Sequence, residues 1–283
     1  MIWTIRSVLA WAKGYLQDKG VDSPRLDAEL LLSHALGKER IELYLDMDKP
    51  LSVDELAGYR VLLKRRSHRE PVAYILGRKE FFSHTFLVNR DVLIPRSETE
   101  ILVEKASELA PPGSTVFEIG AGSGAVIISI LLSRPDLEGL GNDVSKRALN
   151  VARENARLHD VSDRLRLFQG DLFDALSRQY PTIVVNPPYI AATEADGLQE
   201  EVIRYEPPGA LFAGNDGLDV IRKILADVGN YLVPGGKLVM ETGYGQRLEV
   251  ERIIQRNRGL KMIQWVKDLA GFDRAVVVEK AHG

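Results

Sequence analysis

The tetrapeptide Asn186-Pro187-Pro188-Tyr189 has the residue types needed to hold a planar amino group. Its two prolines lack N–H donors and restrict the backbone, so the loop presents oxygen acceptors without competing amides of its own. We expect the side-chain oxygen of Asn186 and the carbonyl of Pro187 to accept the two hydrogens of a substrate –NH₂ group. Pro188 and Tyr189 complete the predicted substrate site, with Tyr189 flat against the group that carries the nitrogen. Because two acceptors can stabilise the positive charge that develops as an amide nitrogen forms a new bond, we assign catalysis to Asn186 and Pro187; the alternative is an ordinary Pro-Pro turn after a strand.

A glycine-rich stretch at residues 120–125 is typical of a nucleoside site. It joins an apolar run to an apolar helical pattern, where glycines let a ligand approach the backbone and the helix N-terminus offers unpaired N–H groups. About 20 residues further on, Asp143 ends the next apolar run, at a position from which a carboxylate can bind both hydroxyls of a ribose. A third loop holds Asp171 and Leu172, which suit the exocyclic amine and the face of an adenine ring. The alternative is that Asp171 only caps the next helix.

The glycine loop does not choose among nucleoside cofactors. Gly120, Gly122 and Ala125 also satisfy the dinucleotide-binding fingerprint, which leaves a nicotinamide oxidoreductase open at this point. An oxidoreductase does not explain the Asn-Pro-Pro-Tyr loop. A binding measurement with S-adenosylmethionine and with a nicotinamide nucleotide would separate the two classes.

Two different periodicities are predicted to position these loops. Residues 1–78 repeat apolar side chains near the helical period, which predicts a small all-α N-terminal domain, and residues 79–94 are predicted to form a β-hairpin linker. From residue 95 to residue 283, strand-like runs alternate with helical ones, which predicts an α/β domain with a mainly parallel sheet and helices on both faces. The predicted strands are 115–119, 137–142, 165–168, 182–185, 237–241, 262–266 and 275–279. Ligands of such sheets bind outside the carboxyl ends of the strands, where all three loops fall.

The composition argues against several classes of protein. The 283 residues include no cysteine, and the five histidines are not closely paired, so we expect no metal site. A net charge of −3 and a pI near 6.0 argue against a large nucleic-acid footprint. No apolar run approaches the roughly 20 residues that cross a bilayer, and the N-terminus lacks a signal-peptide core. We therefore expect a soluble, cytoplasmic protein.

An ordered set of segments over nearly the whole chain resembles the HemK/PrmC family of protein-(glutamine N5) methyltransferases. The matching segments are residues 70–77, 92–100, 120–125, 186–190, 206–207, 210–211 and 216–218. The resemblance implies a Rossmann-like class I methyltransferase sheet, with S-adenosyl-L-methionine as methyl donor and S-adenosyl-L-homocysteine as product. It implies as substrate the glutamine of the Gly-Gly-Gln motif in class I peptide-chain release factors, which the helical N-terminal domain would help to recognise. We expect neither a membrane nor a nucleic acid to be a stable partner of a protein of this kind.

The resemblance also implies which residues contact the cofactor. Together with Asp171 from the argument above, they are Gly120, Ala121, Gly122, Ser123, Gly124, Asp143, Leu172 and Asn186. The competing hypothesis is a methyltransferase for the exocyclic amine of adenine or guanine, which presents the same planar group to the same acceptors. The short helical region and the acidic net charge disfavour that hypothesis.

Several positions depart from the usual family pattern or receive no role. The departures are Glu118 for Asp, Ala121 for Thr, Ser97 for Pro, and Leu172 where some relatives have an aromatic residue. We expect Ser97 to form a capping box with Glu100, and we interpret the basic cluster at residues 64–69 as a solvated helix face. The sequence assigns no chemistry to Arg96 or Glu98. Glu241 is not expected to act as a general base, because a methylated amide nitrogen can release its extra proton to solvent.

Overall fold

The computed structural model describes residues 2–174, 176–268 and 270–281, and its contacts divide the chain into two compact units. One unit, here called the helical unit, comprises residues 1–78 together with 199–205. The other, the sheet unit, comprises residues 79–198 and 206–283. Each unit has its own apolar core.

The helical unit is built from amphipathic helices around one core. Its helices are α1 (Ile5–Asp18), α2 (Pro24–Leu36), α3 (Arg40–Leu45), α4 (Val53–Ser67), α5 (Val72–Leu76) and α9 (Glu200–Tyr205). Side chains at helical spacing on α1, such as Ile5, Ala12 and Leu16, are fully buried. At the start of α4, the Ser52 hydroxyl accepts from the Glu55 backbone and the Glu55 carboxylate accepts from the Ser52 backbone, which satisfies two unpaired N–H groups of that helix.

An ionic cluster holds the late segment α9 in the helical unit. The guanidinium of Arg66 bonds Asp27 (Nε to Oδ2, 2.6 Å) and Glu201 of α9 (Nη2 to Oε1, 2.8 Å), and Arg69 pairs with the same Glu201. The Arg66 side chain is only 6% exposed. The interpretation of the basic cluster as a solvated helix face is therefore wrong for Arg66, because buried carboxylates from α2 and α9 enclose it. The local sequence of α9 contains no pattern that predicts the pairing of Glu201 with Arg66.

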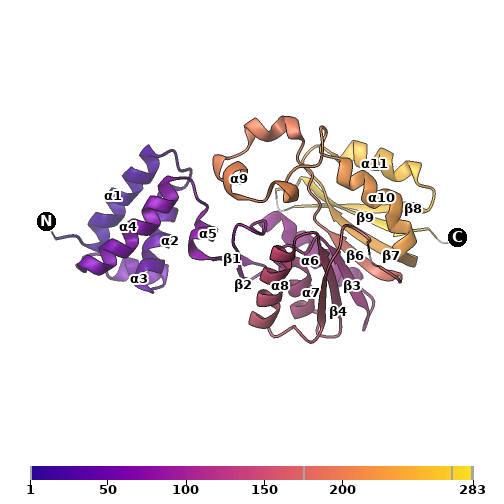
Figure 1. Cartoon of the computed structure of the whole chain (residues 1–283), viewed down its shortest axis with the longest axis horizontal. Coiled ribbons are helices and arrows are strands. Elements are labelled where there is room, and N and C mark those ends of the chain that lie inside the picture. The colour runs from indigo at the N-terminus through magenta and orange to yellow at the C-terminus, as the bar shows by residue number, and fades with distance from the viewer. Residues whose placement is uncertain (1, 175, 269, 282–283) are drawn as a thin grey trace. The chain divides into compact units, whose positions relative to one another are not determined.

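The sheet unit contains a seven-stranded sheet and, apart from Arg78, a small hairpin (Figure 1). The hairpin is β1 (Arg78–Phe81) and β2 (His84–Leu87). The sheet strands are β3 (Thr115–Ile119), β4 (Glu138–Asp143), β5 (Leu165–Gln169), β6 (Tyr180–Val185), β7 (Leu232–Glu241), β8 (Leu260–Lys267) and β9 (Asp273–Lys280). Their order is β5-β4-β3-β6-β7-β9-β8, and only β9 runs antiparallel to its neighbours β7 and β8. The prediction of a mainly parallel sheet is confirmed.

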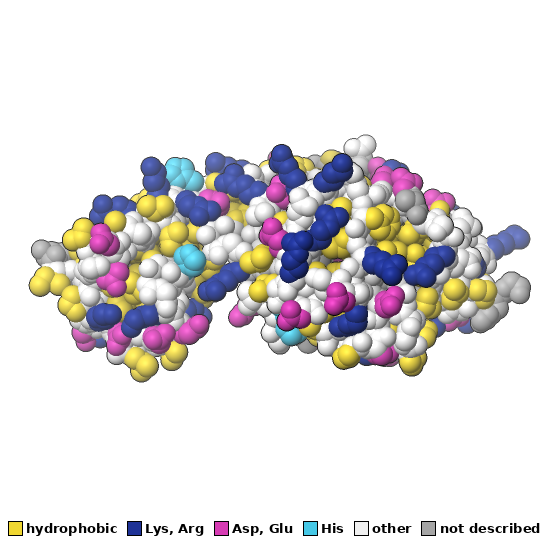
Figure 2. Space-filling view, turned by 60° about the horizontal axis from the view of Figure 1, so that its bottom comes forward, with side chains coloured by type: hydrophobic (Ala, Val, Ile, Leu, Met, Phe, Trp, Pro, Cys, Tyr) yellow, Lys and Arg dark blue, Asp and Glu magenta, His cyan; other side chains and the backbone are white. Residues whose placement is uncertain are grey.

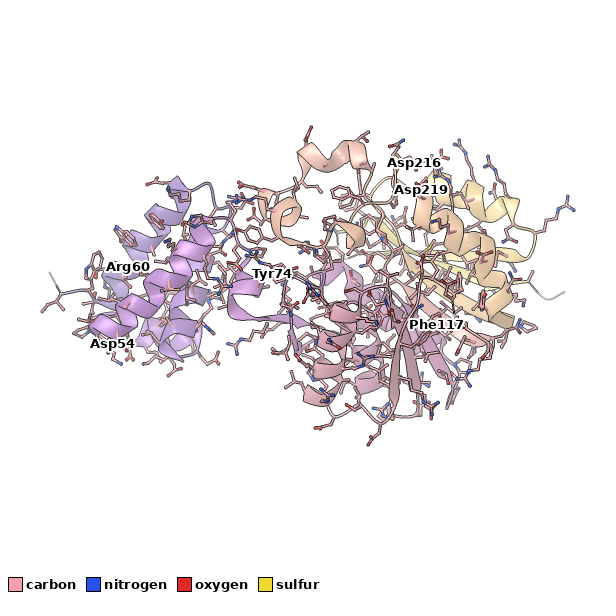
Figure 3. All side chains as sticks on the ribbon, viewed as in Figure 1. Asp54, Arg60, Tyr74, Phe117, Asp216 and Asp219 are labelled. Atoms are coloured by element: carbon pink, nitrogen blue, oxygen red, sulfur yellow. The ribbon has the colours of Figure 1, made fainter. Side chains whose placement is uncertain are left out.

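Helices cover both faces of the sheet, as predicted. The helices of this unit are α6 (Glu100–Leu109), α7 (Ala125–Ser133), α8 (Lys146–Leu158), α10 (Asp219–Tyr231) and α11 (Arg247–Arg256), with short 3₁₀ turns η1 (Ser97–Thr99), η2 (Ala192–Gly197) and η3 (Pro208–Ala210). One core cluster joins α6, α7 and α8 to one face, and a second joins α10 and α11 to the other. Phe117 of β3, labelled in Figure 3, belongs to the second cluster. Its ring packs on that of Tyr180, with centroids 5.4 Å apart.

Within the described ranges, no helix has both the length and the apolarity required to span a bilayer. Nor do these residues include any group of three or more His, Asp or Glu side chains arranged to hold a metal ion.

Candidate active site

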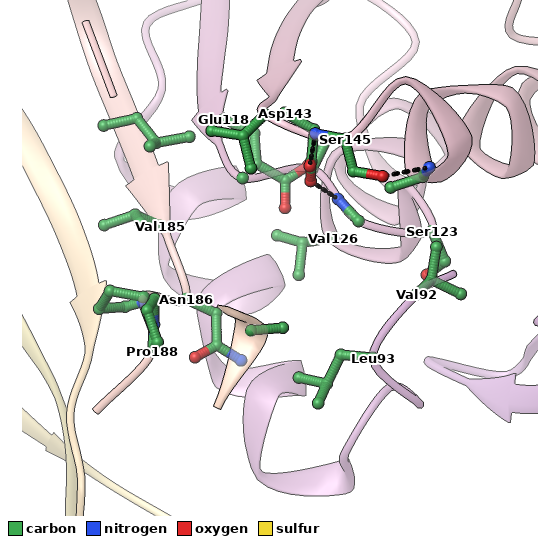
Figure 4. A pocket seen from close by; sticks show the side chains of 18 of the residues that line it. Val92, Leu93, Glu118, Ser123, Val126, Asp143, Ser145, Val185, Asn186 and Pro188 are labelled. Carbon is green, nitrogen blue, oxygen red and sulfur yellow. Dashed lines mark hydrogen bonds between the residues drawn. The ribbon is translucent and has the colours of Figure 1, made fainter. Parts of the chain in front are cut away.

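A cavity of about 350 Å³ opens at the carboxyl ends of β3, β4, β5 and β6. This edge of a parallel sheet is the usual place for ligands, and the volume lies within the range of small-molecule sites. The three loops singled out in the sequence meet here. Figure 4 labels Ser123 of the glycine loop, Asp143 and Asn186 among the lining residues. Of the predicted site residues, those that line the cavity are Gly120, Ala121, Gly122, Ser123, Asp143, Asp171, Leu172, Asn186, Pro187 and Pro188. Gly124 and Tyr189 are not among the described residues that line it.

Asp143 holds the glycine loop as well as facing the cavity. Its Oδ2 accepts the N–H of Gly122 at 2.9 Å, and its Oδ1 accepts the N–H of Ser145 at 2.8 Å. Gly122 has φ +54°, a conformation that favours glycine. A carboxylate has about four acceptor sites, so two remain after these backbone contacts. Asp143 can therefore order the loop and still accept two hydroxyl hydrogens.

Gly124 lies directly before α7, in close contact with α7 and α8. A Cβ at this position would lie 2.9 Å from Cδ1 of Ile128 and 3.3 Å from Cβ of Ala152, and the residue has φ +78°. Glycine is therefore required for the close approach of the loop to α8 at the point where α7 begins. The expected contact of Gly124 with a cofactor stays a prediction.

Asn142 links the glycine loop to the loop that holds Asp171 and Leu172, a role that the sequence analysis missed. Its backbone carbonyl accepts the N–H of Ala121 at 2.7 Å, and its side chain donates from Nδ2 to the carbonyl of Leu172 at 2.8 Å. Leu172 has φ +46°, which is uncommon for a residue with a β-carbon and costs of order 1 kcal/mol or more. Asn142 thus holds Leu172 in a strained position on the cavity wall. Its place next to Asp143 at a strand end was the available signal.

Glu118 braces the helix that follows the glycine loop. It is buried, and its Oε2 accepts the N–H of Ile127 at 3.1 Å, one of the first-turn donors of α7 that lack an intrahelical partner. Burial raises the pKa of Glu118 well above its ordinary value, the Ile127 N–H lowers it, and nearby Asp143 raises it further. Glu118, which stands where family members usually have Asp, therefore still provides a carboxyl acceptor for the first turn of α7.

The Asn-Pro-Pro-Tyr loop leaves the sheet directly after β6. Pro187 is buried, and Pro188 is partly exposed on the cavity wall. The side chain of Asn186 donates from Nδ2 to the hydroxyl of Thr99 at 3.1 Å. The Tyr189 hydroxyl donates to Oε1 of Glu241 at 3.2 Å. Stacking of Tyr189 on a substrate stays a prediction.

The segment after the hairpin contributes a wall that the sequence analysis did not assign. Asp91, Val92, Leu93, Pro95, Arg96 and Thr99 all line the cavity. Arg96 pairs with the buried carboxylate of Glu206, whose Oε2 also accepts the N–H of Ile94 at 3.1 Å. The sequence signal for this wall was the resemblance of residues 92–100 and 206–207 to one family. That resemblance marked both segments as important but did not predict the contacts of Glu206 with Arg96 and Ile94.

The expected capping box of Ser97 with Glu100 is wrong. Residues 97–99 form a 3₁₀ turn, and α6 begins at Glu100 without a side-chain cap. The Ser97 hydroxyl donates to Glu98, while Oε1 of Glu100 accepts the N–H of Phe82 at 2.8 Å. The Glu100 carboxylate therefore bonds the backbone of the hairpin at Phe82 and does not form a capping box with Ser97.

Comparison with known proteins finds the same two parts of the chain. The family described as PrmC N-terminal domain matches residues 7–77, and the family described as Methyltransferase small domain matches residues 97–259. A release factor glutamine methyltransferase of Geobacter sulfurreducens is 45% identical over 97% of this chain and 96% of its own length. One of Rhodopirellula baltica is 39% identical over 99% and 97%. A solved methyltransferase of Pyrococcus furiosus, 16% identical with a TM-score of 0.52 over 70% of this chain and 89% of its own, shares the fold of the sheet unit.

Proposed function

The chain belongs to the family of release factor glutamine methyltransferases, and we propose on that basis that it methylates the side-chain amide nitrogen of the glutamine in the Gly-Gly-Gln motif of class I peptide-chain release factors. The methyl donor of the proposal is S-adenosyl-L-methionine. The observation that carries it is a cavity lined both by the loops of a nucleoside site and by Asn186, Pro187 and Pro188 of the Asn-Pro-Pro-Tyr loop, residues 186–189, here called the amide loop.

The donor fits the residues on the cavity wall. Asp143 keeps acceptor sites for two ribose hydroxyls after binding the backbone of Gly122 and Ser145. Leu172 offers an apolar face for the adenine, and Asp171 beside it offers an acceptor for the exocyclic amine. When bound, S-adenosylmethionine supplies an electrophilic methyl group on a sulfonium ion.

The residues of the amide loop would prepare the nucleophile. An amide nitrogen is weakly nucleophilic because its lone pair is delocalised into the carbonyl. Acceptance of its two hydrogens by the Asn186 side chain and the Pro187 carbonyl favours the geometry in which the lone pair is free, and stabilises the charge that grows in the transition state. Since the methylated nitrogen is acidic, its extra proton can leave to solvent.

We further propose that the helical unit takes part in recognising the release factor and that the protein acts in the cytoplasm, where translation takes place. The first part is supported by the match of residues 7–77 to a domain model of this family. In the helical unit, the ionic cluster of Arg66 fixes the segment 199–205.

The competing hypothesis of a nucleobase methyltransferase is not favoured. Two release factor glutamine methyltransferases match this chain over nearly their full length. A duplex-binding enzyme usually needs a concentrated basic face, whereas the net charge of this chain is −3. Figure 2 shows Asp and Glu as well as Lys and Arg side chains on the face that it draws.

The test is transfer of a labelled methyl group from S-adenosylmethionine to a purified class I release factor. The matched control is the same factor with its Gly-Gly-Gln glutamine replaced, and a third reaction contains DNA in place of the factor. We expect label only on the intact factor. The absence of label on the intact factor, or its transfer to DNA, would overturn the proposal.

A further inference from the structure

A buried carboxyl group lies directly behind the amide loop. Glu241 ends β7, and β6 pairs with β7 so that Val185 is opposite Met240, which brings Asn186 next to Glu241 across the two strands. Glu241 is 1% exposed and is not among the residues that line the cavity. It is therefore adjacent to the loop without direct access to a ligand.

Glu241 is connected to both ends of that loop. At one end, the Tyr189 hydroxyl donates to Oε1 of Glu241 at 3.2 Å. At the other end, Asn186 donates to the hydroxyl of Thr99 at 3.1 Å, and the Thr99 side chain in turn interacts with Glu241. Thr99 is 4% exposed, so water does not compete freely for this contact.

We propose that Glu241 is a positioning residue that orients the carboxamide of Asn186 through Thr99 and anchors Tyr189 directly. This inference rests on the proposed function, because it assigns the orientation of the group that accepts from the reacting amide.

The orientation matters because a carboxamide has one accepting and one donating end. A hydroxyl that donates to a carboxylate has only lone pairs to offer to a second partner. Thr99, so polarised by Glu241, can satisfy the NH₂ end of Asn186 but not its oxygen. The oxygen is then the end left for the substrate. Without Glu241, Thr99 can donate to Asn186 instead, and the flipped carboxamide would present NH₂ to an NH₂ group.

Burial of the Glu241 carboxyl group in the folded protein is energetically unfavourable. Burial raises the pKa of Glu241 to about 7, while Thr99, Tyr189 and Arg274 lower it and Glu98 raises it. Among the described residues, Oε2 has no hydrogen-bond partner. Burying a polar atom in this way is unfavourable, and perturbed groups of this kind concentrate at functional sites.

The experiment compares Glu241→Gln, Thr99→Val and Tyr189→Phe in the full chain, with methyl transfer to a class I release factor as the assay and both substrates saturating. We expect Glu241→Gln and Thr99→Val each to lower kcat about 10–100-fold, since small errors in placing a reacting group have effects of this size. The dissociation constant for S-adenosylmethionine should stay within about threefold. Because both changes break one relay, the double variant should be little slower than the slower single variant.

The matched control is Thr242→Val, next to Glu241. Thr242 is fully buried, and no described residue bonds its hydroxyl, so the same isosteric change there should leave kcat within about twofold. If Glu241→Gln does not fold, Thr99→Val decides the question. A kcat within threefold of the parent for either Glu241→Gln or Thr99→Val, or effects that multiply in the double variant, would overturn the inference. Failure of the proposed function is distinct, because the parent protein itself would then be inactive on the release factor.

Discussion

The replacement Asp143→Asn tests the nucleoside site by exchanging one carboxylate oxygen for an NH₂ group. The carboxylate accepts the N–H groups of Gly122 and Ser145 at 2.9 and 2.8 Å, and two of its acceptor sites remain for ribose hydroxyls. An asparagine has one accepting oxygen with two sites, and its NH₂ group would face one of the two backbone donors. It can therefore keep one backbone contact and accept from one hydroxyl.

The expected loss of affinity follows from this count. One charge-assisted hydrogen bond to a ribose hydroxyl disappears, at about 1.5–3 kcal/mol, and the other becomes a neutral bond that is weaker by about 1 kcal/mol. The sum of about 2.5–4 kcal/mol corresponds to a dissociation constant for S-adenosylmethionine that rises about 10²–10³-fold. The backbone donor that loses its acceptor should cost the fold only about 1 kcal/mol.

Isothermal titration of the parent and the variant with S-adenosylmethionine measures this difference. Glu138→Gln is the matched control, because Glu138 is exposed at the other end of the same strand, and we expect its affinity to equal that of the parent. If Asp143→Asn binds within threefold of the parent while its circular dichroism and thermal midpoint are unchanged, the assignment of Asp143 to the ribose is refuted.

Three further outcomes are expected. Asn186→Ala should lower kcat about 10²–10³-fold with both substrates saturating, by analogy with loss of a group that acts only in the transition state; a kcat within a few-fold would contradict this. As pH rises from 5 to 8, the free energy of unfolding of Glu241→Gln, measured in urea titrations, should rise by about 2–3 kcal/mol relative to that of the parent. The reason is that a carboxyl group whose pKa is raised to about 7 stabilises the parent fold below pH 4.5 and loses that contribution as pH rises through 7. A difference between variant and parent that does not change with pH would exclude the raised pKa. Arg66→Met should destabilise the helical unit by about 3–5 kcal/mol, because it leaves the buried carboxylate of Asp27 unpaired and Glu201 with Arg69 alone, whereas the exposed neighbour Lys64→Met should have little effect.

Local patterns predicted the parts of the fold that depend on local physics. The strand 115–119, the glycine turn and the position of Asp143 followed from apolar runs and from the need of tight turns for glycine, and the structure has β3 and a left-handed Gly122 at these places. The direction of β9 was not predictable in this way, because an apolar run is compatible with either parallel or antiparallel pairing.

What the sequence could not predict depends on partners far apart along the chain. Arg66 and Glu201 are 135 positions apart, and Asn186 and Thr99 are 87 apart. Nothing in the neighbourhood of either residue marks the other. Glu100 shows the converse case: its spacing from Ser97 matched a capping box, yet a distant backbone N–H, that of Phe82, took the carboxylate. Tertiary contacts of this kind decide which of several locally acceptable partners a side chain takes.

Two buried carboxyl groups, Glu118 and Glu241, support two of the loops at the cavity, and their partners show that they do so differently. Glu118 accepts one backbone N–H, that of Ile127, with one oxygen. A neutral carboxyl group keeps such an acceptor, so this support does not require ionisation, in agreement with a pKa raised well above the ordinary value. Glu241 interacts with two hydroxyl groups, those of Thr99 and Tyr189, and a hydroxyl can reverse its role when its partner gains a proton. The glycine loop therefore has a support that is insensitive to charge, whereas the amide loop depends on a group that must act as an acceptor to determine which end of Asn186 meets the substrate.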